Sequence, residues 1–197
     1  MSRSCFYRNE PCRTRFPGRG FIPVLFLLLL PALLGALDGG VPFSDGWQAA
    51  FSDNPAYKDL SNLSPEWKDT DLPSFWSKIE TKDSVFIWLK KEFHVPENLK
   101  GQDLELYLGK LRGAVEVYLN GTLAGYHGKM PPKFFYHETI PKNILFPEGL
   151  LNRGGSNMVA VRIFNESAEF TIPEIMLGPK GNFNKISAIA DLLGNQI

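Results

Sequence analysis

The chain has almost no cysteine: its only two, Cys5 and Cys12, lie close to the N-terminus of the 197 residues. The rest of the chain therefore cannot form a disulfide, bind a metal through thiolates or use a cysteine nucleophile. Histidine is also scarce, because His94, His127 and His137 are the only three, and their spacing fits no His-x-x-x-His metal motif. The sequence accordingly predicts no metal site and no cofactor.

The chain also lacks the charge that a nucleic-acid partner would require. Lys and Arg together number 21, as do Asp and Glu; without the five arginines and one glutamate of residues 1–36, 16 basic residues face 20 acidic ones, a net charge of −4. Nucleic-acid binding depends on clustered basic residues, so this composition excludes it. Catalytic and phosphate-binding glycine motifs are missing too, since "NRGGSN" at residues 152–157 precedes a predicted strand and not a helix.

The one long apolar run lies at the N-terminus. Five arginines within residues 1–20 precede "FIPVLFLLLLPALLGAL", residues 21–37, which ends with the small residues Gly35 and Ala36. This pattern predicts a signal peptide, residues 1–36, removed after Ala36. The alternative is an uncleaved membrane anchor, but the run is short for a bilayer span and contains two prolines. We therefore expect an exported protein with no membrane insertion after cleavage.

Beyond this signal the sequence is organised as short strands. Residues 37–80 predict a loop-rich segment that packs on the main domain through Trp67 and Trp76, with one strand at residues 47–51. Apolar residues then recur at every second position, which predicts further strands. These strands lie in "SVFIWLKKEFHV" (84–95), "QDLELYLGKL" (102–111), "NMVAVRIF" (157–164) and "FTIPEIML" (170–177).

A hairpin is the clearest local signal, in "VYLNGTLAGY" at residues 117–126. Asn120 and Gly121 both tolerate the positive φ that a two-residue type I′ turn requires, so we interpret Asn120 as turn geometry and not as a ligand contact. Short strands separated by turns, with no amphipathic helix between them, predict an all-β fold, an antiparallel jelly-roll β-sandwich spanning residues 81–180. Residues 181–197 are a C-terminal tail, in which "ISAIADLL" either forms one short helix or stays irregular.

An ordered series of motifs gives the chain a family resemblance. Trp88, the pair Lys90 and Lys91, and Phe93 precede "VP", an apolar strand, "GAVEVYLNG" and "NMVAVRIFN". This series, within residues 45–180, closely resembles the N-terminal sugar-binding domain of glycoside hydrolase family 2 enzymes. The resemblance implies a jelly-roll sandwich of the galactose-binding domain-like superfamily and a carbohydrate ligand. In that family the catalytic carboxylates lie on a separate barrel, so the resemblance implies that this domain is not an enzyme.

Two further segments are similar to a sub-group of these domains. "FSDNPAYKD" and "GKMPPKFFYHETIPKNILFPEGLL" resemble domains at the front of bacterial, notably spirochaete, envelope sensor proteins. That resemblance implies a location in the periplasm or cell envelope, and a membrane signalling chain or a glycosidase chain as partner. The chain departs from the pattern at residues 166–174, where "ESAEFTIPE" replaces a glycine-rich turn, and no catalytic barrel or signalling domain follows Ile197.

Sugars bind proteins by stacking on aromatic rings and by hydrogen bonds, and such groups are found near the hairpin. The predicted ligand-binding residues are Trp88, Arg112, Tyr126, His127, Tyr136 and His137. The alternative for Trp88 is a structural one, in which it fills the space between a sheet and the N-terminal segment together with Phe86. Strand carboxylates are usually solvated, so we predict no catalytic residue among Glu92, Glu105, Glu116 and Glu138.

The sequence thus favours a non-catalytic carbohydrate-binding or ligand-sensing module of a bacterial envelope. Two other functions stay open: an accessory or truncated N-terminal domain of a family 2 glycoside hydrolase, and a protein–protein adaptor with no small ligand. Asn62, Asn120 and Asn165 also match the Asn-x-Ser/Thr glycosylation motif, which matters only in a eukaryotic secretory pathway.

Overall fold

A computed structural model of the chain describes residues 39–59, 67–70, 72, 85–137, 139–166 and 175–183. All of them lie in the compact unit Gly35–Ile197. Several sequence predictions concern residues outside the described ones: the signal peptide, Trp76, most of the "ESAEFTIPE" segment and the helix expected in "ISAIADLL". In the described part, no helix has the length and apolar character needed to span a bilayer.

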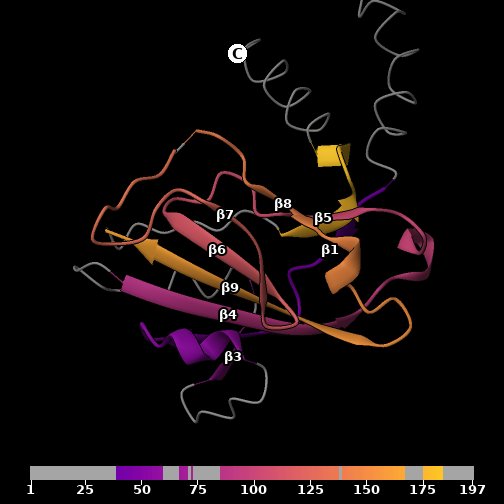
Figure 1. The fold of residues 1–197 in the computed structure, drawn as a ribbon, viewed down its shortest axis with the longest axis horizontal. Helices are drawn as coiled ribbons and strands as arrows, with labels where there is room; N and C mark the ends of the chain where they lie inside the picture. The colour runs from indigo at the N-terminus through magenta and orange to yellow at the C-terminus, as the bar shows by residue number, and fades with distance from the viewer. Residues whose placement is uncertain are drawn as a thin grey trace, which may run out of the picture. The chain divides into compact units, whose positions relative to one another are not determined.

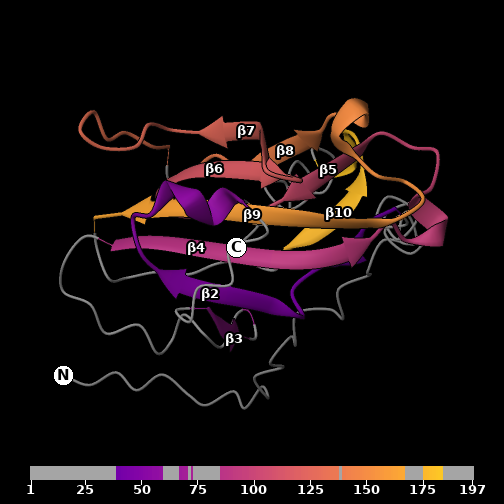
Figure 2. The ribbon, with the colours of Figure 1, turned by 60° about the horizontal axis from the view of Figure 1, so that its bottom comes forward.

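The described strands form two antiparallel sheets (Figures 1 and 2). The smaller sheet has four strands, in the order β1 (Val41–Pro42), β10 (Met176–Pro179), β5 (Leu104–Tyr107) and β8 (Asn143–Phe146). The larger sheet has six strands, in the order β3 (Lys68–Thr70), β2 (Trp47–Phe51), β4 (Val85–His94), β9 (Ser156–Asn165), β6 (Ala114–Leu119) and β7 (Thr122–His127). The predicted all-β antiparallel sandwich is confirmed.

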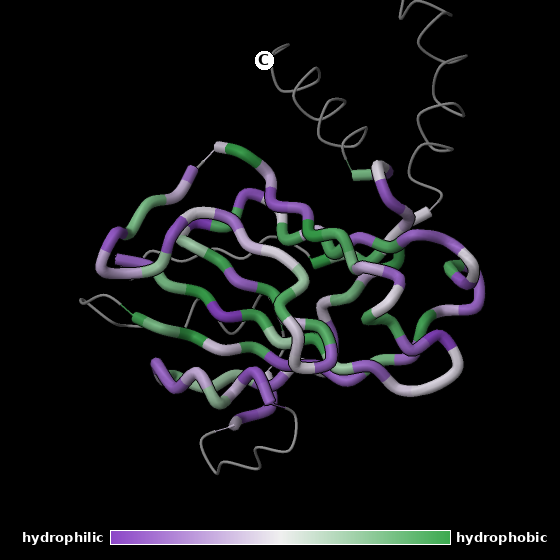
Figure 3. The backbone as a smooth tube through the Cα atoms, in the orientation of Figure 1, coloured by the Kyte–Doolittle hydropathy of each residue, from purple (hydrophilic) through white to green (hydrophobic). Residues whose placement is uncertain are grey.

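The main core lies between the two sheets and is built from alternating residues of their strands. On β4, the side chains of Ile87, Leu89 and Phe93 are buried in this core, as the period-two pattern predicts. Lys91 interrupts that pattern, but its ammonium donates to the backbone carbonyls of Phe43 and Asp45 at the margin of the core. In Figure 3, hydrophobic and hydrophilic residues are interspersed along the backbone of the strands, as expected where alternate residues face the core.

A smaller apolar cluster covers the outer face of the six-stranded sheet. It consists of Ala50, Tyr57, Trp88 and Ala160, with Trp67 and Tyr118 packed against it. Tyr57 comes from the short 3-10 helix η1 (Pro55–Lys58), which lies against β9 and β4 in Figure 2. The indole of Trp88 is 0% exposed, so the structural alternative for this residue is the correct one. Trp67 packs against this cluster, with its ring 5.1 Å from that of Tyr57 and the ammonium of Lys90 4.2 Å from the same ring.

The β6–β7 turn has the predicted geometry, with φ of 51° at Asn120 and 82° at Gly121. The side chain of Asn120 also forms hydrogen bonds with neighbouring segments. Its amide nitrogen donates to the carbonyl of Leu150 (2.8 Å) and to Oδ1 of Asn157 (3.0 Å), and its Oδ1 accepts from the N–H of Met158 (2.8 Å). The turn is thereby fixed to β9 and to the short helix η4 (Glu148–Leu150), and this glycosylation motif is occupied by internal bonds.

Three short strands escape the sequence pattern: β1, β3 and β8, of two, three and four residues. Such short segments have too few positions to show a period, and their pairing partners are what define them. Strand β1 pairs with β10, more than 130 residues further along the chain, through Val41 and Leu177. The three short strands therefore form because they pair with distant segments. The alternation of apolar residues within each strand does not reveal this pairing.

Candidate functional site

Strand β7 forms an edge of the six-stranded sheet and separates two cavities. Tyr126 pairs with Glu116 of β6, and the next residue, His127, pairs with the buried Val115. Because successive side chains of a strand point to opposite faces, Tyr126 and His127 lie on different sides of β7. The two cavities have volumes of about 310 Å³ and about 290 Å³, and both are lined by Gly128, directly after the strand.

The first cavity, here called the Tyr126 cavity, combines an exposed aromatic ring with polar groups. Its lining residues are Ala114, Val115, Glu116, Leu123, Tyr126, Gly128, Lys129 and Met130. The Tyr126 side chain is 66% exposed, the most exposed of the large apolar side chains on the described surface. A ring in this position has a free face for stacking, and Glu116 and Lys129 supply an acceptor and a donor beside it.

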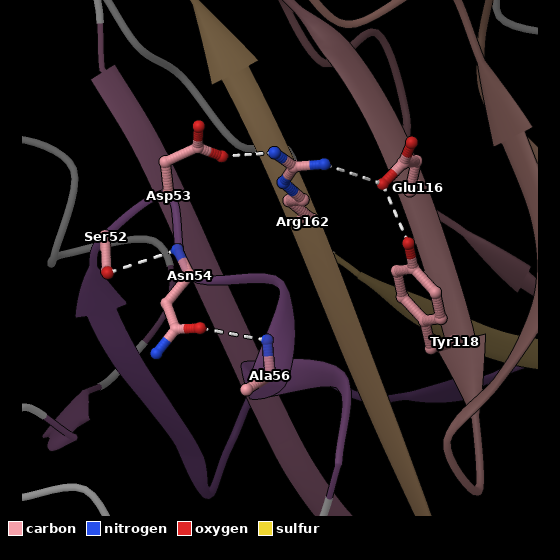
Figure 4. A network of polar contacts seen from close by, with 7 residues as sticks. All are labelled: Ser52, Asp53, Asn54, Ala56, Glu116, Tyr118 and Arg162. Atoms are coloured by element: carbon pink, nitrogen blue, oxygen red, sulfur yellow. Dashed lines mark hydrogen bonds and ion pairs between the residues drawn. The ribbon is translucent and has the colours of Figure 1, made fainter.

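Glu116 is held in place by a polar network on the outer face of the sheet (Figure 4). The hydroxyl of Tyr118 donates to Oε2 of Glu116 (2.8 Å), and Nη1 of Arg162 donates to the same oxygen (3.2 Å). The other terminal nitrogen of Arg162 donates to Asp53. Burial, together with the bond to Glu116, raises the pKa of Tyr118 to about 12, so this hydroxyl remains a donor throughout the ordinary pH range. Both bonds end on Oε2, which leaves Oε1 of Glu116 as an acceptor.

The second cavity, here called the Lys142 cavity, is lined by His127, Gly128, His137, Ile140 and Lys142. Nε2 of His127 lies 3.2 Å from the backbone carbonyl of Asn143 on β8. A carbonyl only accepts, so Nε2 of His127 carries the proton. The imidazole of His137 is exposed and packs edge-on against the ring of Phe135 at 4.8 Å.

Lys142 is a buried cation, with only 2% of its surface exposed. Its Nζ donates to the carbonyl of Leu111 and to that of His137, the latter at 3.1 Å. Burial lowers the pKa of Lys142 from its ordinary value. The sequence reasoning missed this residue, because nothing in "IPKNILF" distinguishes a buried lysine from the common exposed one.

The structure brings three of the six predicted ligand residues to one end of the hairpin. Tyr126 lines one cavity, and His127 and His137 line the other. The half-buried Tyr136, whose ring lies 5.4 Å from that of Phe134, lines neither of these two cavities. Arg112 is likewise half-buried and lines neither. The expectation for Trp88 is corrected: a ligand has no ring face to stack on, because the indole is enclosed by Tyr57 and Tyr118.

The carboxylates considered for catalysis have separate partners in the structure. Glu92 accepts from the hydroxyl of Ser156, and the buried Glu105 accepts from the N–H of Phe183 at 3.4 Å. Glu138 lies outside the described residues. Within the described ranges, no group of three or more His, Asp or Glu side chains is arranged to hold a metal ion.

Comparison with known proteins gives a match in structure but not in sequence. No protein-family model and no curated protein matches the chain. Among solved structures, a β-glucuronidase of Bacteroides uniformis superposes on 71% of the chain with a TM-score of 0.55 and 16% sequence identity. A family 2 glycosyl hydrolase of Bacteroides cellulosilyticus covers the same share with a TM-score of 0.56 and 17% identity. The chain shares its fold with part of these family 2 glycoside hydrolases.

A putative β-galactosidase of Bacteroides fragilis gives the same result, with 70% of the chain covered, a TM-score of 0.51 and 20% identity. The chain spans about a fifth of the length of these three enzymes, since it covers 18%, 20% and 22% of them. Identities this low demonstrate a common fold and nothing about ligands. The family resemblance seen in the sequence is therefore supported as a β-sandwich similarity.

Proposed function

We propose that this protein is an exported, non-catalytic carbohydrate-binding or ligand-sensing module of a bacterial envelope, and that it binds sugar in the Tyr126 cavity. The exposed ring of Tyr126 beside Glu116 and Lys129 is the observation that carries this proposal. Sugar sites combine an aromatic platform with a few polar groups in fixed positions, and this cavity offers both within about 310 Å³.

In the proposed complex, the C–H face of a pyranose ring stacks on Tyr126, and the neighbouring Leu123 extends the apolar surface. A sugar hydroxyl donates to Oε1 of Glu116, while the ammonium of Lys129 donates to a sugar oxygen. Arg162 and Tyr118 hold the carboxylate of Glu116 before the ligand arrives, which reduces the entropy lost on binding.

The test is a glycan array followed by calorimetry with any glycan that binds, using the protein as exported from a bacterial host. Tyr126→Ala should abolish the array signal or weaken it about tenfold, the effect of one lost stacking face. Phe51→Ala is the matched control, because Phe51 is another exposed aromatic residue (47%) but lies on β2, near the far edge of the same sheet. Equal binding by both variants would refute the site, and no glycan binding by the parent would favour the adaptor function.

The fold comparison also favours a second function, an accessory part of a family 2 glycoside hydrolase. In this case too we expect the chain by itself to contribute no catalytic carboxylate pair. We expect the purified protein to release no chromophore from aryl β-glucuronides or aryl β-galactosides. Turnover that disappears on changing one glutamate would instead make the chain an enzyme.

Export is tested separately from ligand binding. N-terminal sequencing of the protein from its native host should give Leu37 as the first residue, as the signal pattern predicts. Recovery of intact Met1 in the membrane fraction would instead support the membrane-anchor alternative.

A further inference from the structure

The Lys142 cavity contains a buried positive charge that the described residues do not neutralise. Lys100, Arg153 and Arg162 form ion pairs, whereas Lys142 pairs with none of the described carboxylates. Burying an ammonium without a counter-charge costs free energy, because the group loses its hydration. A buried lysine beside a cavity therefore indicates that something in the cavity compensates the charge.

The protein satisfies only part of the hydrogen-bonding capacity of this ammonium. Two carbonyls, of Leu111 and His137, accept from Nζ, whereas an ammonium has three N–H donors. These two bonds tie the loop after β5 to the loop before β8, which is a structural role. They leave one donor and the full positive charge of Lys142 for a ligand.

The remaining walls suit a small organic anion. His127 and His137 add imidazole nitrogens, and Ile140 adds an apolar surface, in a cavity of about 290 Å³. A phosphate group is usually held by arginine forks, a glycine-rich nest or a helix N-terminus, and none of these lines the cavity. One buried lysine matches a single negative charge, as a carboxylate carries.

We propose that the Lys142 cavity binds a carboxylate, with the anion accepting from Nζ of Lys142 and from the imidazole of His137, while His127 forms part of the wall. Ile140 packs against the carbon skeleton of the ligand. This site is separate from the proposed sugar site, because the two cavities have no lining residue in common except Gly128. An acidic sugar and a simple carboxylic acid share the chemistry that the site recognises.

The experiment measures binding of sodium D-glucuronate, sodium acetate and D-glucose to the whole protein by calorimetry and by thermal shift, at constant ionic strength set with sodium chloride. We expect saturable binding and a raised melting temperature with D-glucuronate, and none with D-glucose. Binding of both acetate and D-glucuronate would mean that the carboxylate suffices. Binding of D-glucuronate but not of acetate would mean that the sugar ring contributes. Both results support the proposal.

Two variants test the location of the site. Lys142→Met keeps an unbranched side chain only one atom shorter and removes its charge, and should weaken D-glucuronate binding about tenfold or more. Ile140→Trp fills the cavity without removing the bonds of Lys142, so it tests the same site if Lys142→Met does not fold. Leu145→Trp is its matched control, because Leu145 is an exposed aliphatic residue of β8 that does not line the cavity.

Three results would overturn the proposal. One is the absence of any carboxylate binding to the parent protein beyond the effect of chloride. Another is binding of D-glucose to Tyr126→Ala, which lacks the proposed sugar platform, with the same affinity as D-glucuronate. The last is unchanged D-glucuronate binding in Ile140→Trp. Tyr126→Ala should leave D-glucuronate binding intact, which keeps failure of this site distinguishable from failure of the Tyr126 cavity.

Discussion

The two ends of the β6–β7 hairpin use polar side chains in opposite ways. At the turn, the amide of Asn120 is fully engaged with its neighbours, and its partner Asn157 is 1% exposed and itself bonded to Asn152. At the open end, the ring of Tyr126 faces solvent and the charge of Lys142 has no described counter-charge. Polar groups that satisfy one another hold the fold together, whereas those left unsatisfied are available to a ligand.

Gly128 lies at the centre of the open end, and its replacement by alanine should have the largest effect on stability. Its φ is +80°, and an added Cβ would lie 2.3 Å from the carbonyl oxygen of Phe135. That oxygen accepts from the N–H of Lys129, so the loop between these residues must shift. We expect a loss of about 3 kcal/mol in the free energy of unfolding, measured by urea denaturation.

Gly101→Ala is the matched control for Gly128. Its φ is +75°, but an added Cβ there meets nothing within 4 Å. It should therefore cost only the backbone strain, about 1 kcal/mol. Equal losses in the free energy of unfolding for the two variants would show that the loop between Lys129 and Phe135 shifts at no extra cost. This loop would then differ from the rigid turn in the same way as the two cavities do.

Asn120→Ala tests the turn end and should reduce the free energy of unfolding by about 2 kcal/mol. The change places alanine at positive φ, and it removes the acceptor of the Met158 N–H and the donor to the Leu150 carbonyl. Backbone strain at this turn would by itself cost only about 1 kcal/mol. Asn120→Gly separates the two causes, because glycine tolerates positive φ but, like alanine, lacks the side-chain amide. An unchanged free energy of unfolding in Asn120→Gly would mean that the hydrogen bonds of this amide add nothing to stability.

Lys142 should make stability depend on pH in a way that its methionine variant does not. Burial lowers the pKa of Lys142 in the folded state below the ordinary value of 10.5, so the unfolded chain binds this proton more tightly. Stability rises with pH wherever the unfolded state binds more protons. Between the lowered pKa and 10.5, the free energy of unfolding of the parent should therefore increase relative to that of Lys142→Met.

This difference is read from urea denaturation of both proteins at a series of alkaline pH values, in chloride buffers without carboxylates. The lowered pKa values of Lys90 and Lys91 are common to both proteins and cancel. A constant difference across the series would mean that Lys142 is not desolvated in the folded protein. The open end would then lack the unsatisfied charge that sets it apart from the turn.

Tyr126→Ala should have the smallest effect on stability, within about 0.5 kcal/mol, because its side chain is 66% exposed. Its effect is expected in ligand binding alone. A melting curve measured beside the glycan array separates the two readouts. A marked fall in melting temperature with glycan binding retained would place Tyr126 among the residues that hold the fold, and the two ends of the hairpin would no longer differ in kind.

The sequence predicted the long strands and the turn because their signals are local. Alternation along β4 and β9 depends on which face is buried, and the φ values at Asn120 and Gly121 depend on residue type. For the candidate site, it predicted one group of six residues, of which Tyr126 lines one cavity and His127 and His137 line the other. The strand period of two already implied that neighbours such as Tyr126 and His127 point to opposite sides of β7.

By itself the sequence determined an antiparallel sandwich, one hairpin turn and the absence of cysteine chemistry beyond Cys12. Only the tertiary structure decided that Trp88 lies beneath η1, that Arg162 positions Glu116, and that Lys142 is buried. The physical reason is the distance along the chain between partners: Arg162 and Glu116 are 46 residues apart, and Lys142 and Leu111 are 31 apart. Residue type and spacing specify local backbone conformation, whereas burial and charge compensation are set by the segments that folding brings together.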